Sequence, residues 1–177
     1  MDKMLSTTIL GLRYKNKVAM GSDGQVTLEN TIVKSGACKI RKLYNNKVLV
    51  GFAGGAADAL TLFERFEAKL EEYHGNLDRA VVELVKEWRT DRVLRRLEAM
   101  IGILDQKHSY IVSGNGDIID VDDGIIALGS GGPYALACAK ALIKHSNLNA
   151  KEIVEESIRI AASICIYTNT HITVQEL

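Results

Sequence analysis

Short runs of β-branched and apolar residues, separated by turn-forming residues, make up the first third of the chain. The stretch 14–17 (YKNK) can turn one run into the next, and 44–46 (YNN) can do the same because asparagine tolerates turn conformations. This pattern predicts a region that is mostly β-sheet. The predicted strands are residues 7–13, 18–23, 38–43 and 47–52.

The hydrophobic period changes after Gly54 and Gly55, where apolar residues begin to recur every three or four positions. Gly75 is expected to end a first amphipathic helix, and Asn76 to cap a second one that continues through 89–98. Two adjacent helices therefore follow the first strands. Their apolar stripes are Leu60, Phe63, Phe66, Leu70 and Tyr73, then Leu77, Val81, Leu84, Val85 and Trp88.

A second group of strands is predicted at 99–104, 110–113, 117–119 and 125–128, with Asn115-Gly116 as a hairpin turn. Pro133, the only proline, then suits the first turn of a helix that runs to about His145. Asn149 and Glu152 have the spacing of a capping box for a last helix, and a strand near 172–174 closes the chain.

Two groups of strands and two helix pairs, without regular βαβ alternation, indicate an α+β fold. We expect a four-layer αββα sandwich in which two antiparallel sheets stack between helical layers. The length of 177 residues suits one domain, predicted to span 7–177.

Composition excludes several classes of protein. The chain is 47% hydrophobic and has 22 basic and 22 acidic residues, so no net charge favours nucleic acid or an anionic membrane. No apolar run approaches the roughly 20 residues that span a bilayer. Three cysteines without a CxxC pair argue against a disulfide framework or a zinc site and favour a reducing cytoplasm.

The common hydrolase and phosphate-binding motifs are absent from the sequence. There is no GxSxG elbow, HExxH helix or GxxxxGK[ST] loop, and the four histidines fall at predicted element ends and turns. A nucleotide-binding module stays as an alternative from another class, although the glycine-rich stretch at 51–56 fails the GxGxxG pattern.

A threonine at the chain's own N-terminus needs no histidine, because it supplies a hydroxyl nucleophile and an α-amine base that titrates near 7.7 to 8.0. Thr7 opens the first strand, Lys39 could keep such an amine neutral, and Asp23 could hold the lysine. Gly51 and Ser130 stand at small-residue strand ends that could approach a substrate. Each of these residues also has an ordinary structural explanation as a strand, turn or cap residue.

Seven motifs in order resemble the HslV (ClpQ) peptidases, which are N-terminal-nucleophile hydrolases related to proteasome β subunits. The resemblance covers Thr7 to the end and agrees with the αββα architecture. The motifs are TTILGLR, SDGQVT, GFAGGAADALTLFERFEAKL, WRTDRVLRRLEA, SGNGDII, GSGGPYALA and ICIYTN.

The resemblance implies a role for each site residue. Thr7 would be the nucleophile and its amine the base, Lys39 and Asp23 would tune the site, and Thr8 would neighbour it. Ser130 would support the site, and the Gly51 amide would form an oxyanion hole. A sodium ion would bind backbone oxygens of Ala162, Cys165 and Thr168, although position 162 is more often glycine in the family.

The resemblance also implies a homododecamer of two stacked hexameric rings. A hexameric HslU-type ATPase would unfold protein substrates and feed them to it. The six residues before Thr7 depart from the family pattern, and their removal would need cleavage after Ser6, or initiation at Met4 followed by trimming. A non-catalytic ring subunit of the same fold and a small-molecule amidohydrolase using the same nucleophile remain alternatives.

Overall fold

The computed structural model of the chain describes residues 7–91 and 99–177. The predicted leader, 1–6, and the predicted extension of the second helix over 92–98 lie outside the described residues. Within them, no helix is both long enough and apolar enough to cross a membrane.

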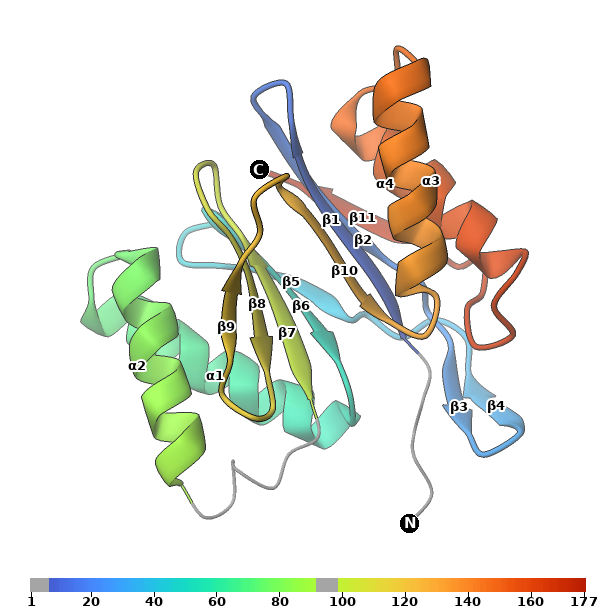
Figure 1. The fold of residues 1–177 in the computed structure, drawn as a ribbon. Helices are drawn as coiled ribbons and strands as arrows, with labels where there is room; N and C mark the ends of the chain where they lie inside the picture. The colour runs from blue at the N-terminus through green and yellow to red at the C-terminus, as the bar shows by residue number, and fades with distance from the viewer. Residues whose placement is uncertain (1–6, 92–98) are drawn as a thin grey trace.

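Two antiparallel sheets form the centre of the molecule (Figure 1). The first has the strand order β10-β1-β2-β11, so the first and last strands of the chain share one sheet. The second has the order β5-β6-β7-β8-β9. The first sheet comprises β1 (Thr8–Tyr14), β2 (Lys17–Ser22), β10 (Ile125–Gly129) and β11 (Thr173–Glu176). The second comprises β5 (Ile40–Leu43), β6 (Val48–Ala53), β7 (Met100–Leu104), β8 (Ser109–Ser113) and β9 (Ile118–Asp120).

Four helices cover the outer faces of the two sheets. Helices α1 (Ala56–Glu72) and α2 (Leu77–Thr90) pack on the five-stranded sheet, and α3 (Gly132–His145) and α4 (Ala150–Ala162) pack on the four-stranded sheet (Figure 1). Three separate apolar cores result, one under each helix pair and one between the sheets. Four layers enclosing three cores confirm the predicted αββα sandwich.

The predicted helix boundaries have the expected local chemistry. The Asn76 side chain accepts a hydrogen bond from the Arg79 amide at the start of α2. Asn149 and Glu152 form the capping box of α4, and Pro133 lies in the first turn of α3. Each contact satisfies or avoids an unpaired amide at a helix start.

One pair of strands was not expected from the sequence. β3 (Val26–Leu28) and β4 (Thr31–Lys34) form a separate antiparallel hairpin that projects from the sandwich near the start of β1 (Figure 1). Every residue of β4 is exposed, so this strand has no buried face and no alternation that would reveal it.

Candidate active site

Thr7 and Thr8 lie where the β1 strand begins, at one end of the sandwich. Thr8 pairs with Gly129 of β10, and both threonines are buried. Gly129 has a φ of +83°, and a side chain there would overlap the Thr7 carbonyl oxygen. The β10 end is therefore glycine because the Thr7 backbone lies directly against it.

A buried ion pair lies beside these threonines. The Asp23 carboxylate is fully buried at the end of β2 and accepts hydrogen bonds from the Thr8 amide at 2.8 Å and from Lys39 Nζ at 2.8 Å. The Gln25 amide donates to its second oxygen at 2.9 Å, and Lys39 Nζ also donates to the Gln25 carbonyl at 2.7 Å. Asp23 thus fixes both the Thr8 backbone and the lysine ammonium.

The environment of Lys39 shifts its proton affinity. Burial lowers the pKa of the Lys39 ammonium from its ordinary value, because a charge loses hydration in the interior. The Asp23 carboxylate opposes that shift through its charge and its hydrogen bond. The ion pair with Asp23 offsets part of the desolvation free energy of the buried ammonium.

Two further hydroxyl groups meet at the same end of β1. Thr8 Oγ1 and Thr168 Oγ1 are 2.7 Å apart, and both residues are buried. A side chain at Gly131 would press against both hydroxyl groups, so the glycine leaves room for their contact. Ser130 lies next to Gly131, and its buried Oγ has no hydrogen-bond partner among the described residues.

The closing segment of the chain contacts the aspartate as well. The Asn169 amide donates to the second Asp23 oxygen at 3.4 Å, and its side-chain oxygen accepts from the Gly24 amide at 3.1 Å. Asn169 Nδ2 donates to the Ser35 carbonyl at 2.9 Å. Asn169 therefore joins the Asp23 turn to the segment before Lys39. Sequence reasoning did not single it out, although it stands within the ICIYTN motif.

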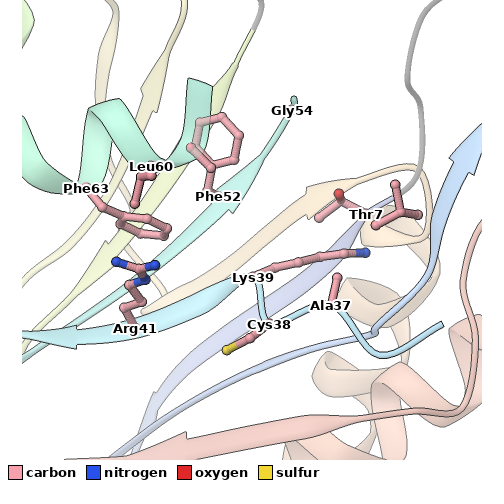
Figure 2. A pocket seen from close by; sticks show the side chains of 11 residues that line it. Thr7, Ala37, Cys38, Lys39, Arg41, Phe52, Gly54, Leu60 and Phe63 are labelled. Carbon is pink, nitrogen blue, oxygen red and sulfur yellow. The ribbon is translucent and has the colours of Figure 1, made fainter. Parts of the chain in front are cut away.

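A pocket opens between Thr7 and the second sheet (Figure 2). Thr7 lies at one end, Lys39 and Cys38 line one side, and Phe52 and Phe63 line the other (Figure 2). A concave pocket with apolar walls and a few polar groups is typical of a ligand-binding site.

Gly51, whose amide the resemblance assigns to an oxyanion hole, is not among the described residues that line this pocket. Gly51 is a central residue of β6, paired with Ile40 on one side and with Gly102 on the other. A side chain at Gly51 would come within 2.9 Å of Ile9 and of Met20, so it faces the core between the sheets. Gly54, just beyond the end of β6, is the glycine that lines the pocket.

The predicted sodium ligands lie at the end of α4 and in the turns that follow it. Ala162 is the last residue of the helix, and the Thr168 amide donates to the Cys165 carbonyl at 3.1 Å. A carbonyl oxygen has two lone pairs, so the Cys165 oxygen retains one for a cation. Within 7–91 and 99–177, no three His, Cys, Asp or Glu residues gather as a metal site. A cation at these residues would therefore depend on backbone oxygens, the ligand type that a hard cation prefers.

Fold and site together define a class of protein. The family model described as "Proteasome subunit" matches residues 4–177, and the chain belongs to that family. Within it, the chain is similar to the eukaryotic HslV from Trypanosoma brucei, with 44% identity, a TM-score of 0.90, and coverage of 96% of this chain and 98% of that one. This relative bears out the HslV-type resemblance.

The same fold also occurs in a more distant protein. Thiobacillus denitrificans BPH, solved in complex with epoxomicin, is 18% identical with a TM-score of 0.74, covering 96% of this chain and 97% of that one. A second structure of BPH has a TM-score of 0.71 at the same identity and coverage. At this identity the likeness shows the fold alone.

Proposed function

We propose that this chain is the proteolytic subunit of a two-component ATP-dependent protease and that it cuts peptide bonds with Thr7. The observation that supports this most is the position of Thr7 at the start of β1, in one pocket with the ammonium of a buried Lys39–Asp23 pair. The proposal requires that residues 1–6 be removed, because only a free Thr7 amine has a basic lone pair.

The mechanism is acyl transfer. Thr7 Oγ attacks the carbonyl carbon of the scissile bond, and its proton passes to the Thr7 α-amine. The tetrahedral intermediate collapses to an ester on Thr7, and the ammonium returns the proton to the departing amine. Water, activated by the same α-amine, then attacks the ester and releases the acid product with the threonine restored.

Each neighbouring group has a defined part in these steps. The Lys39 ammonium disfavours a second positive charge nearby, which keeps the Thr7 amine neutral and basic at neutral pH. Asp23 holds Lys39 charged and fixes the Thr8 amide. The Gly54 backbone lines the pocket and is the group we assign to stabilise the oxyanion, in place of Gly51. Ser130, whose hydroxyl has no hydrogen-bond partner among the described residues, is proposed to assist proton transfer.

We further propose the assembly and the partners that the family resemblance implies. These are a homododecamer of two stacked hexameric rings in the cytoplasm, a hexameric HslU-type ATPase that activates the peptidase, and unfolded proteins as substrates. Exposed apolar side chains support subunit contacts, since Ile164 and Ile166 are 55% and 78% exposed. Sodium at Ala162, Cys165 and Thr168 would brace the segment that carries the Thr168 hydroxyl.

Peptide hydrolysis by matched variants tests the proposed function. A chain that begins at Thr7 should cleave a fluorogenic peptide, Thr7→Ser should retain part of the rate, and Thr7→Ala should lose it. The assay is run with and without the matching ATPase. Equal hydrolysis by the Thr7→Ala chain would overturn the proposal, and a folded but inactive Thr7 chain would favour a non-catalytic ring subunit.

A further inference from the structure

The pocket beside Thr7 combines an apolar wall with one guanidinium group. Phe52, Leu60 and Phe63 supply the wall from β6 and α1, and Arg41 of β5 lies below the Phe63 ring (Figure 2). The Arg41 guanidinium carbon is 5.1 Å from the centre of that ring. A cation–π contact of this kind restricts the guanidinium, which reduces the entropy that it loses when it binds a ligand.

Lys39 immediately precedes β5 and Arg41 is the second residue of that strand, and both line the pocket. Side chains alternate along a β-strand, so residues two apart point the same way, while the intervening Ile40 is buried between the sheets. Lys39 lies nearer Thr7, and Arg41 lies toward the other end of the pocket (Figure 2). A side chain that enters beside Thr7 therefore passes the lysine first and ends near the arginine.

The two cations differ in what compensates their charge. The Lys39 ammonium is paired with the Asp23 carboxylate at 2.8 Å. Arg41 makes no ion pair within the part of the chain that the structure describes, and no carboxylate is found among the described side chains that line the pocket. The pocket therefore has a positive charge that no described carboxylate neutralises, at its end away from Thr7.

We propose that Arg41 selects the substrate residue on the acyl side of the scissile bond, favouring glutamate over its neutral isostere glutamine and disfavouring lysine. This inference rests on the proposed function of the site. The methylene groups of glutamate lie against the apolar wall, and its carboxylate meets the guanidinium in a charge-assisted hydrogen bond. A lysine in the same place would bring its ammonium against Arg41 without a partner.

The test uses four short fluorogenic peptides that differ only in the acyl-side residue, which is Glu, Gln, Leu or Lys. They are compared with the Thr7-starting protein, its Arg41→Met and Arg41→Lys variants, and Lys42→Met. Lys42 is the next residue of β5, is exposed, and is not among the described residues that line the pocket. Lys42→Met therefore removes one charge from the same strand without changing the pocket.

The measured quantity is the ratio of kcat/KM for the glutamate peptide to that for the glutamine peptide. We expect a ratio of about five in the parent protein, the effect of one partly exposed charge pair, and a ratio near one in Arg41→Met. Arg41→Lys and Lys42→Met should both keep a preference for glutamate. The preference should also weaken as salt is raised from low ionic strength.

The outcomes separate this inference from the proposed function. Cleavage of the leucine peptide with the same Glu to Gln ratio in the parent and Arg41→Met proteins overturns the role of Arg41 and leaves the threonine mechanism standing. A parent protein that cleaves the lysine peptide faster than the glutamine peptide also overturns it. If no peptide is cleaved and Thr7 does not react with a threonine-directed electrophile, the proposed function itself fails.

Discussion

Removing either partner of the buried Lys39–Asp23 pair should lower the free energy of unfolding. Removing both should lower it by less than the sum of the two single changes. Asp23 is fully buried and Lys39 is 9% exposed, so a group left without its partner cannot regain full hydration. Attraction between charges 2.8 Å apart is about 6 kcal/mol at an effective dielectric constant of about 20. Desolvation cancels much of this gain.

Lys39→Met leaves the Asp23 carboxylate buried with its backbone donors, including the amides of Thr8 and Gln25. We therefore expect a loss of about 3 kcal/mol in the free energy of unfolding, at the lower end for a broken buried pair. Asp23→Asn should cost a similar amount, and the coupling energy from the double mutant should be about 2 kcal/mol.

Urea unfolding measures these energies at one fixed subunit concentration, since assembly shifts apparent stability. Trp88, the only tryptophan, is fully buried under the second sheet and reports unfolding by its fluorescence. Lys42→Met is the matched control, because it removes an exposed lysine of β5, three residues along the chain from Lys39. A coupling energy below about 0.5 kcal/mol would show that Lys39 and Asp23 do not stabilise each other, since independent sites add to within that range.

Four further predictions concern pH, the threonine contacts and a distant control. The pKa of Lys39 is lower in the folded protein than in the unfolded chain, so the unfolded chain binds more protons between that lowered pKa and about pH 10.4. Across this range the free energy of unfolding of the parent protein should rise with pH relative to that of Lys39→Met. Urea unfolding at a series of pH values measures the difference. Gly129→Ala should cost about 1–3 kcal/mol and slow peptide cleavage, because its φ is +83° and its side chain would displace the Thr7 carbonyl. Thr168→Val should lower the free energy of unfolding by about 1–3 kcal/mol, because it leaves the Thr8 hydroxyl unpaired. Thr168→Ser keeps a hydroxyl at this position and should retain most of that stability. Asn76→Ala should lower stability by about 1 kcal/mol through the lost α2 cap without changing the pH profile of cleavage.

The sequence predicts most of the fold because most of its elements bury one face. Apolar stripes, such as the one that ends at Trp88, predict the helices. Residues such as Asn45 and Gly116, which adopt positive φ, predict the turns. The β3–β4 hairpin was missed because its strands are largely exposed and have no periodic apolar face. Hydrophobic periodicity predicts only those helices and strands that bury one face against the rest of the protein.

The site could be predicted less completely, because it depends on contacts between distant segments. Asp23 and Lys39 are 16 residues apart, and nothing in their spacing shows that Nζ reaches the carboxylate. Gly51 was predicted at the site and Gly54 was not, because the end of β6, which lies between them, is visible only in the structure. Asn169 acts through three segments that meet only after folding.

Thr7 must be the first residue of the chain for the proposed site to work. The full chain and a chain that begins at Thr7 are each characterised by intact mass, treated with a peptide epoxyketone that reacts with both a hydroxyl and a free amine, and assayed for peptide cleavage. We expect that only molecules beginning at Thr7 form the adduct and cleave the peptide. Cleavage at full rate by molecules whose mass shows residues 1–6 still attached would contradict it.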